Sequence, residues 1–377
     1  MWTENAEATT CSGHFLRVIS QESQQERNKM IRINQIKLDI GTDEKILNSK
    51  IQKLLRLKNS SFTYSIVKKS IDARKKEHIM YIYSVDVKVD GIDETALVRK
   101  LNNKDIIINK NIKYVFPQIK DTHKNKKIAI IGSGPAGLFC GLLLARAGFK
   151  PVIYERGGNV HERTGIVNAF FETGVLDTET NIQFGEGGAG TFSDGKLNSV
   201  IKEKDGRIRK VLETFVEFGA NPEILYVNKP HVGTDVLSVV VSNIRNEIIR
   251  LGGTVNFNSK VTDIYIDTGK ITGIRVNDEY DEEFNAVVLA PGHSARDTFE
   301  MLLKKGVEME KKSFAVGMRI EHNQSLINNF AYGRDDNGPL PVADYKVTAK
   351  ADNNRGVYSF CMCPGGYVVN ALSLIHI

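Results

Sequence analysis

Hydrophobic and polar residues follow two different patterns along the chain, and the change falls near Lys127. Before this point, stretches in which apolar and polar residues alternate are interrupted by stretches with apolar residues at helical spacing. After it, short and wholly apolar runs are separated by longer amphipathic segments. Alternation is typical of half-buried strands, whereas short apolar runs indicate strands that are covered on both faces. The pattern therefore predicts two domains of different architecture.

The first domain is predicted over residues 30–115, with the element order βαββαβ. We expect strands at residues 31–40, 62–69, 79–89 and 106–108, and helices at residues 42–57 and 93–101. Thr42 is expected to cap the first helix, whose apolar face carries Ile46, Leu47, Ile51, Leu54 and Leu55. This order is that of a small ferredoxin-like α+β domain. Residues 1–29 are expected to be disordered or to be a non-native extension, and residues 116–126 to form a linker.

The most informative stretch opens the second domain, predicted over residues 127–371. An apolar strand leads into Gly132, Gly134 and Gly137 at the spacing Gly-x-Gly-x-x-Gly, followed by a helix, a second apolar strand and Glu155. Gly132 allows a sharp turn, Gly134 lets a pyrophosphate approach the backbone at the helix N-terminus, and Gly137 lets the helix pack on the sheet. Glu155 stands where a carboxylate can accept hydrogen bonds from ribose hydroxyls. This sequence predicts a Rossmann-like α/β domain that binds an ADP-containing cofactor.

The rest of the second domain continues the α/β pattern. Helices are predicted at residues 207–218 and 235–251, the latter capped by Thr234, and strands at residues 254–258, 260–267, 270–276 and 286–289. The last six residues, 372–377, end the chain in the middle of an apolar element. We therefore expect a C-terminally truncated sequence with a non-native tail.

Composition narrows the class of protein. The chain has 377 residues, of which 41% are hydrophobic and 25% charged, as in soluble globular proteins. No apolar run approaches the roughly 20 residues that span a bilayer. Four cysteines are too few and too scattered for a disulfide framework, which favours a reducing, cytoplasmic setting.

The net charge of +6 is concentrated in the first domain, where we count about 22 basic and 11 acidic residues between Met30 and Lys127. Such a module is compatible with binding to RNA, to an acidic partner or to an anionic substrate. A lysine-rich, solvated surface explains the same excess without any partner.

A second Gly-x-Gly-x-x-Gly match spans Gly185–Gly190, but no apolar strand precedes it and no acid-terminated strand follows at the right distance. It is therefore not a second nucleotide fold. With the residues up to Gly195 it forms a long glycine-rich loop. Its backbone amides are suited to line a phosphate or to lie flat against an aromatic ring system, and a tight surface loop is the alternative.

The chain resembles the FAD-dependent oxidoreductases of the glutathione-reductase-like, two-dinucleotide class. More narrowly, it is similar to the bacterial and plastid family often labelled NAD(FAD)-utilising dehydrogenase or FAD-dependent protein C. The similarity runs from about Met30 to Val369. It is carried by residues 131–139 (Ile-Gly-Ser-Gly-Pro-Ala-Gly-Leu-Phe), 155–157, 181–196, 229–235, 292–297 and 358–366.

This resemblance implies that the cofactor is FAD, with NAD(P)H as a candidate electron donor. The glycine turn would hold the pyrophosphate, the acid after the second strand the adenosine ribose, and the glycine-rich loop the ribityl chain and flavin. Val261 would meet the adenine, and Ala290–Gly292 would cross beside the cofactor, with Pro291 in place of the family's threonine. The expected cofactor-binding residues are Gly132, Gly134, Pro135, Ala136, Gly137, Glu155, Arg156, Gly187, Gly188, Ala189, Gly190, Thr191, Ser193, Asp194, Val261, Ala290 and Gly292.

No catalytic residue is assigned from the sequence. His293 and His231 are candidates because imidazole titrates near neutral pH, although either histidine could equally bond to backbone in a turn. Cys361 and Cys363 are redox candidates, and two small buried residues are the alternative interpretation. Arg296 and Asp297 are expected to cap the following helix. Two cysteines and scattered histidines do not form a metal-ligand set, so no metal is expected.

Three functions remain open from the sequence. The leading hypothesis is an FAD-dependent oxidoreductase that transfers a hydride or electrons through flavin to an unidentified substrate. The alternatives are an RNA-associated or scaffold flavoprotein with structural FAD, and an NAD-binding protein without flavin. The family's C-terminal Gly-Asp segment has no counterpart here, so we expect this chain to bind FAD weakly or not at all.

Overall fold

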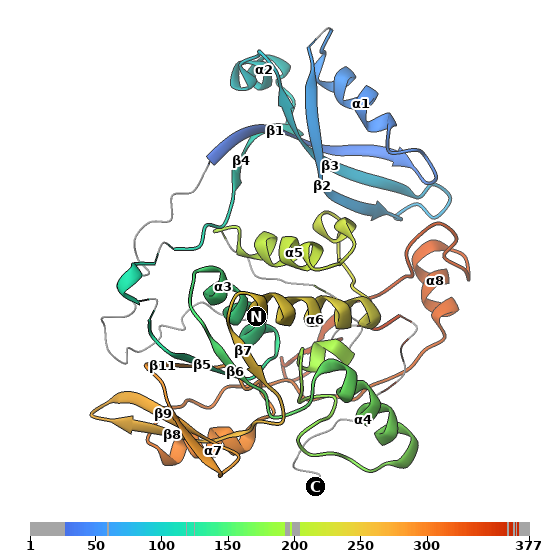
Figure 1. Cartoon of the computed structure of the whole chain (residues 1–377). Coiled ribbons are helices and arrows are strands. Elements are labelled where there is room, and N and C mark those ends of the chain that lie inside the picture. The colour runs from blue at the N-terminus through green and yellow to red at the C-terminus, as the bar shows by residue number, and fades with distance from the viewer. Residues whose placement is uncertain are drawn as a thin grey trace.

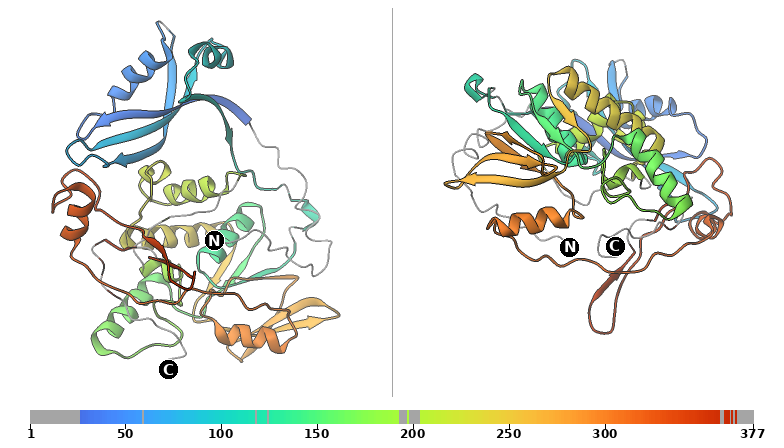
Figure 2. Two further views of the ribbon diagram at one scale, coloured as in Figure 1. Left: turned by 180° about the vertical axis from the view of Figure 1, so that it is seen from behind. Right: turned by 60° about the horizontal axis from the view of Figure 1, so that its bottom comes forward.

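The computed structural model describes residues 27–58, 60–117, 119–123, 125–192, 197, 204–359, 362–364, 366 and 368. Figure 1 and the left view of Figure 2 show an N-terminal sheet at one end of the molecule and a small sheet with one helix at the other. A layer of helices and a parallel sheet lie between them. This arrangement confirms the predicted mixed architecture, with an α+β unit ahead of an α/β unit.

The N-terminal unit has the predicted order βαββαβ. Its four strands form an antiparallel sheet in the order β2-β3-β1-β4, which is the ferredoxin-like arrangement. The elements are β1 (Arg27–Asp39), α1 (Ile46–Leu55), β2 (Phe62–Asp72), β3 (Met80–Val89), α2 (Glu94–Leu101) and β4 (Ile106–Ile112). The first strand therefore begins three residues before Met30.

The first helix is shorter than the sequence pattern predicts. It begins at Ile46 after Lys45, and the backbone of Thr42 instead donates to the Asp39 carbonyl in a turn, so the prediction of a Thr42 cap is wrong. Three of the five apolar residues expected on its face, at positions 47, 51 and 55, are fully buried against the sheet. Ile46 and Leu54 remain 42% and 37% exposed, because a helix on one sheet face buries only a narrow stripe.

The second unit is built on a parallel sheet in the order β11-β5-β6-β7. Its strands are β5 (Ile128–Ile131), β6 (Val152–Tyr154), β7 (Thr254–Asn256) and β11 (Ala286–Leu289). Three helices pack on one face through a shared apolar core. They are α3 (Pro135–Arg146), α5 (Arg207–Glu217) and α6 (Thr234–Arg250). This is the predicted Rossmann-like fold.

A three-stranded antiparallel sheet covers the opposite face of the parallel sheet. Its strands are β8 (Val261–Asp267), β9 (Lys270–Val276) and β10 (Tyr280–Glu283), and α7 (Arg296–Lys304) packs beside it. Ala129, Ile131 and Tyr154 of the parallel sheet share a core with Ile264 and Phe284 of this cover. With both faces covered, the strand ends on the carboxyl side are left to form a binding edge.

Several elements differ from the sequence prediction. Helix α6 begins at Thr234 itself, and its N-cap is Gly233 without a side-chain bond, so Thr234 is not the cap. β10 and five further elements were not predicted, namely α4 (Val160–Thr173), η3 (Ala189–Phe192), α8 (Gln324–Tyr332) and a hairpin of β12 (Thr348–Lys350) and β13 (Gly356–Tyr358). Two short 3₁₀ turns, η2 (Asp121–His123) and η4 (Pro222–Leu225), complete the list. The expected tail, residues 372–377, lies outside the described residues.

The N-terminal unit is docked onto the second unit at two places. Lys69 on the edge strand β2 donates its N–H to the Tyr226 carbonyl at 2.7 Å and accepts the Asn228 N–H at 2.8 Å. Beside it, Ile71 shares a small apolar core with Ile327 of α8. Within the described part of the chain, every helix is too short or too polar to cross a membrane.

The core of the N-terminal unit can be tested at α1. Ile51→Ala removes a fully buried side chain, and we expect it to lower the free energy of unfolding by about 2–4 kcal/mol, since it leaves a cavity. Leu54→Ala, three residues along the same helix and 37% exposed, is the matched control and should cost less than about 1 kcal/mol. Urea unfolding measures both, and equal effects would contradict the observed orientation of the helix.

Candidate cofactor-binding site

A cavity of about 230 Å³ opens at the carboxyl ends of β5, β6 and β11. Eleven of the predicted cofactor-binding residues line it: Gly132, Gly134, Pro135, Ala136, Glu155, Arg156, Gly188, Ala189, Val261, Ala290 and Gly292. Pro291, discussed above as the family's threonine position, lines it as well. Residues that the sequence analysis did not single out also contribute, including Gln183, Phe184, Ser259 and Thr298. The turn after β5, the end of β6 and the glycine-rich loop thus converge on one space.

Glycine is needed at the three positions of the turn after β5 for different structural reasons. Gly132 has a φ of +100°, and a Cβ there would lie 2.3 Å from the Ala290 carbonyl oxygen. A Cβ at Gly137 would lie 1.9 Å from the Gly132 carbonyl oxygen. At Gly134 the closest atom is the Gly188 Cα at 3.9 Å, so a side chain there would meet only the cavity. The fold requires the first and third glycines, and the open space requires the second.

Glu155 holds the two glycine-rich segments together. Its Oε2 accepts from the N–H and the hydroxyl of Ser133 at 2.7 and 2.9 Å. Its Oε1 accepts from the N–H groups of Gly157 and Gly185 at 3.1 and 3.0 Å. Four donors match the roughly four acceptor sites of a carboxylate. A ribose hydroxyl at this position would therefore share or replace one of these protein donors.

The glycine-rich loop is held from behind by Arg163, which the sequence analysis missed. This arginine of α4 is fully buried, and its guanidinium donates to the carbonyls of Asn181, Ile182, Glu186 and Gly188 at 2.7–2.8 Å. Burial lowers its pKa to about 10. The sequence signal that could have predicted α4, the helix that carries Arg163, is the Asn-x-x-Glu capping box at its start. With these carbonyls fixed, residues 181–188 are held in place although they belong to no helix or strand.

Glu186 fastens the same loop to two helices. Its side chain is fully buried, Oε2 accepts the Val160 N–H of α4 at 2.8 Å, and Arg245 of α6 lies 3.4 Å away. Burial raises the pKa of this carboxyl. The loop is therefore anchored by buried polar contacts at both α4 and α6.

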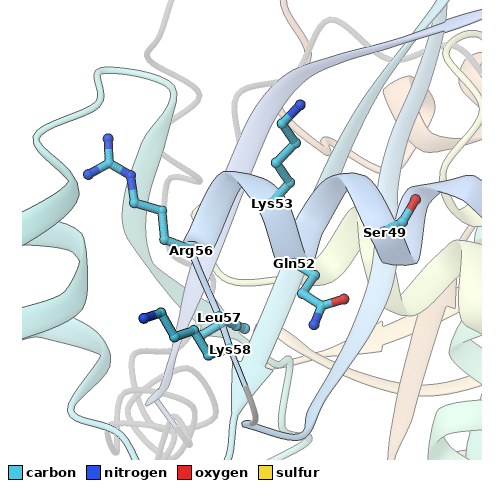
Figure 3. Close-up of a pocket in the computed structure, with 6 residues that line it drawn as sticks. All are labelled: Ser49, Gln52, Lys53, Arg56, Leu57 and Lys58. Carbon is cyan, nitrogen blue, oxygen red and sulfur yellow. The ribbon is translucent and has the colours of Figure 1, made fainter.

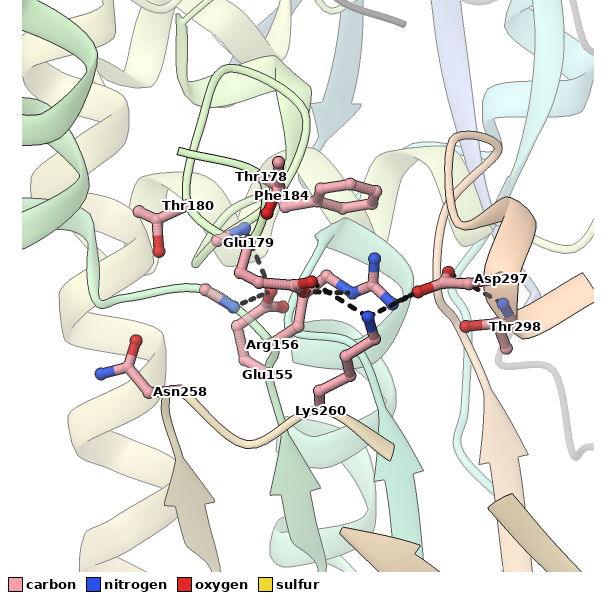
Figure 4. Close-up of polar contacts among 12 residues, drawn as sticks. Glu155, Arg156, Thr178, Glu179, Thr180, Phe184, Asn258, Lys260, Asp297 and Thr298 are labelled. Atoms are coloured by element: carbon pink, nitrogen blue, oxygen red, sulfur yellow. Dashed lines mark hydrogen bonds and ion pairs between the residues drawn. The ribbon is translucent and has the colours of Figure 1, made fainter. Parts of the chain in front are cut away.

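Four charged side chains form a closed cluster at the edge of the cavity, which we call the tetrad: Arg156, Glu179, Lys260 and Asp297. Figure 4 shows the two cations lying between the two carboxylates. Arg156 contacts Asp297 at 2.7 Å and Glu179 at 3.5 Å, and Lys260 contacts Glu179 at 2.9 Å and Asp297 at 2.8 Å. Each cation therefore pairs with both carboxylates.

Asp297 belongs to this tetrad and is not the cap of α7. The N-cap residue is Ala295, without a side-chain bond, and Arg296 is the first residue of the helix, so the predicted capping roles are wrong. Burial alone would raise the pKa of Asp297, but hydrogen bonds from Lys260 and Arg156 outweigh it and lower the pKa from its usual 3.8 to about 2. Asp297 is therefore ionised and paired at neutral pH.

The candidate catalytic residues are not gathered at one place. His293 lines the cavity, is exposed, and lies 3.3 Å from the Ser294 hydroxyl. His231 and Cys363 are exposed and do not line it. Cys361 lies outside the described residues. Among the residues that the structure describes, no three His, Cys, Asp or Glu side chains gather as a metal site.

The remaining predicted cofactor-binding residues fall into two groups. Gly137, Gly187, Gly190 and Thr191 do not line the cavity. Of these, Thr191 is buried below the loop, where its Oγ1 would lie 2.1 Å from a Cβ placed on Gly187. Ser193 and Asp194 lie outside the described residues. No strand leads into the glycine-rich loop, in agreement with its assignment as a loop and not a second nucleotide fold.

A second hollow lies at the C-terminal end of α1, in the N-terminal unit. Figure 3 shows Lys53, Arg56 and Lys58 around it, together with Ser49, Gln52 and Leu57. It is open and basic, and it shares no lining residue with the cofactor cavity. Three of the basic residues of the N-terminal unit therefore gather at one place.

The glycine turn after β5, the carboxylate after β6 and the parallel sheet define a dinucleotide-binding α/β protein. Residues 126–328 match the family model described as pyridine nucleotide-disulphide oxidoreductase, and the chain belongs to this family. Residues 313–375 match a model described as FAD-dependent protein, C-terminal domain-like, and residues 30–88 match a domain of unknown function. These matches identify FAD as the cofactor and agree with the predicted oxidoreductase class.

Comparison with individual proteins found a relative that matches most of this chain. An uncharacterized protein of Clostridium beijerinckii is 48% identical over 347 residues, which cover 91% of this chain but 64% of that protein. Thioredoxin reductase of Pneumocystis jirovecii is 36% identical over 80 residues, 21% of each chain.

Among solved structures, L-proline dehydrogenase from P. horikoshii is 13% identical with a TM-score of 0.33, and covers 50% of this chain and 57% of its own. Lactococcus lactis thioredoxin reductase is 14% identical with a TM-score of 0.25, and covers 45% and 36%.

The tetrad can be tested through its pH dependence. A carboxyl whose pKa is depressed by folding stabilises the protein above its usual pKa, and this contribution is lost as the pH falls through the folded value. Because the Asp297 side chain is 36% exposed, we expect Asp297→Asn to cost only about 1 kcal/mol at pH 7. The cost should shrink as the pH falls from about 4 towards 2. Urea unfolding across this range measures it.

Asp263→Asn is the matched control. Asp263 also accepts the N–H of the next residue and pairs with one lysine, Lys305 at 2.8 Å, but among the described residues no second cation pairs with it. A difference between Asp297→Asn and wild type that stays constant down to pH 2 would contradict the stated pKa.

Proposed function

We propose that this chain carries the FAD-binding part of an oxidoreductase of the FAD-dependent protein C kind. Bound FAD would supply the redox chemistry, by accepting a hydride from NADH or NADPH and passing electrons to a substrate. The chain's own residues bind and orient the cofactor. The match of residues 313–375 to an FAD-dependent C-terminal domain supports this narrower assignment. No finding supports the alternative of an RNA-associated flavoprotein.

The observation that carries the proposal is the open space at Gly134. This glycine is the N-cap of α3, with an extended ψ of −178°, and Pro135 follows as the first helical residue. The helix N-terminus presents partial positive charge to an anion, and the missing side chain leaves room for a pyrophosphate against the backbone. The Cα of Gly188 lies 3.9 Å from a Cβ placed on Gly134 and is the one protein atom within 4 Å that such a Cβ would meet outside its own helix and chain neighbours. The site thus fits a dinucleotide pyrophosphate.

The two ends of the cofactor follow from the cavity lining. Glu155 directly follows β6, and Val261 is the first residue of β8. Both line the cavity, and we assign them to the adenosine. Ala189 and the crossing at Ala290–Gly292 also line the cavity, and we assign them to the flavin end of the cofactor. His293, next along the crossing, is the histidine that we assign to proton transfer near the flavin.

Gly134→Ala tests the proposal without disturbing the fold. The new methyl group finds no protein atom closer than 3.9 Å, so the thermal midpoint should stay unchanged. Because the methyl group occupies the pyrophosphate space, we expect FAD affinity to fall about tenfold or more. Quenching of flavin fluorescence in a titration measures it, and it remains usable when binding is weak.

Gly165→Ala is the control, because a Cβ there meets nothing within 4 Å and Gly165, on α4, does not line the cavity. It should leave FAD affinity unchanged. If Gly134→Ala binds FAD as tightly as wild type does, the proposed position of the pyrophosphate is wrong.

Reduction of the bound flavin tests the enzymatic part. Mixed anaerobically with NADH or NADPH, the FAD-loaded protein should lose its visible flavin absorbance. We expect His293→Gln to retain FAD but to slow this reduction about tenfold or more, since glutamine cannot transfer a proton as the imidazole would. A variant that binds FAD and is reduced as fast as wild type would remove His293 from the proposed role.

A further inference from the structure

We propose that residues 314–320, which we call the docking strand, bind a further polypeptide by β-strand pairing. The partner is a polypeptide equivalent to the part of the longer Clostridium beijerinckii relative that lies outside its match to this chain. This inference goes beyond the proposed function and does not depend on the cofactor site. It assigns an interaction surface to the segment between α7 and α8, for which the oxidoreductase function gives no role.

Large apolar residues alternate with small or charged ones along the docking strand. The apolar residues occupy every second position, at Phe314, Val316, Met318 and Ile320. In an extended chain, successive side chains point to opposite faces, so these four share one face. This alternation is typical of a strand that packs one face against a core and leaves the other in water.

In the structure, the apolar face of the docking strand is uncovered. Its four apolar residues are 85%, 86%, 100% and 71% exposed, in chain order. Residues 308–323 are all exposed and belong to no helix or strand, and Figure 2 shows this stretch as coil between α7 and α8. The backbone of residues 314–318 makes no hydrogen bond to another described residue. A single exposed apolar side chain is ordinary, whereas a continuous row of them marks an interaction surface.

The β12–β13 hairpin is uncovered in the same way. Its two strands pair with each other, and every residue in them is exposed. Val357 and Tyr358 are 56% and 50% exposed. A hairpin of two strands is marginally stable in water, and needs a third strand or a covering core. The hairpin and the docking strand both lie within residues 313–375, so they belong to the same family domain and lack cover together.

The partner must supply both a strand edge and an apolar core. A second copy of this chain could pair strand to strand, but a ribbon of two such strands would leave their apolar rows in water. The Clostridium beijerinckii relative has polypeptide to spare, because the match covers only 64% of it. The match is 347 residues long in a chain of 377, and any contiguous match of that length contains the docking strand. A counterpart of the docking strand thus occurs in a protein that has additional chain to cover it.

Hydrogen exchange tests the pairing directly. Backbone N–H groups exchange fast where they face water and slowly in a stable paired strand. In this chain, we expect the amides of residues 314–320 to exchange as fast as those of an unstructured peptide. In the intact Clostridium beijerinckii protein, the amides of the aligned stretch should exchange about a hundredfold more slowly or less.

Two results of this comparison would overturn the proposal. Fast exchange of the stretch in both proteins would show that the additional polypeptide does not pair with it. Slow exchange in this chain by itself would show that the strand is already paired, either within the chain or with a second copy. Sedimentation of the chain would tell these two apart, since only a second copy changes its mass.

A charge on the apolar face gives a second test. Val316→Glu should leave the thermal midpoint of this chain unchanged, since Val316 is 86% exposed. In the relative, glutamate at the position aligned with Val316 should lower the midpoint by about 4 °C or more, because the carboxylate would be buried without a partner. Val175 is the matched control, because it is 75% exposed and distant in sequence. Glutamate at the position aligned with it should leave the relative unchanged. No shift at the position aligned with Val316, or equal shifts at both positions, would overturn the proposal.

Discussion

The buried carboxylate of Glu155 is the contact on which the cofactor site depends. Its two oxygens accept from Ser133 in the turn after β5 and from Gly185 in the glycine-rich loop, which lie 22 and 30 residues away in sequence. A charged acceptor makes stronger hydrogen bonds than a neutral one, and more so away from water. One side chain thus fixes the distance between the two backbone segments that would enclose the cofactor. A ribose bound as we propose would meet the same oxygens, so cofactor binding and folding would then use the same acceptor.

The glycine-rich loop depends on a second buried charge of opposite sign. Residues 181–188 belong to no helix or strand that could satisfy their carbonyls, and buried carbonyls without partners are costly. Arg163 supplies five N–H donors in a planar fork and uses them on four carbonyls at short distances. Arginine suits this task better than lysine, because its donors diverge in one plane. The loop is therefore shaped by a helix that lies before it in the chain.

The sequence predicts what local rules determine. Alternation and helical spacing were sufficient for the ferredoxin-like order and the parallel sheet, and the glycine spacing indicated the turn after β5. Helix starts were less predictable, because Thr42 is a good cap residue that the chain uses in a turn. Local rules could not identify Arg163, Glu179 and Lys260 as site residues. The partners of each lie at least 18 residues away in sequence and meet it only in the folded chain. The sequence alone does not show which arginine will be buried and which exposed.

The N-terminal unit is part of the same body and is not a tethered accessory. The edge strand β2 would otherwise present unpaired backbone groups, and Lys69 uses two of them on the segment between η4 and α6. The Lys69 ammonium reaches back to Glu44 at 2.7 Å, and Tyr83 donates to the same carboxylate at 2.8 Å. Nearby, Ile71 and Tyr81 share a core with α8, which lies within the match to the FAD-dependent C-terminal domain. Since the unit contacts both the α/β domain and this C-terminal segment, a shift of either one against the other would have to break its edge pairing or its apolar core. The basic hollow at the end of α1 remains outside these contacts, so docking and any role for that charge are separate properties of one small domain.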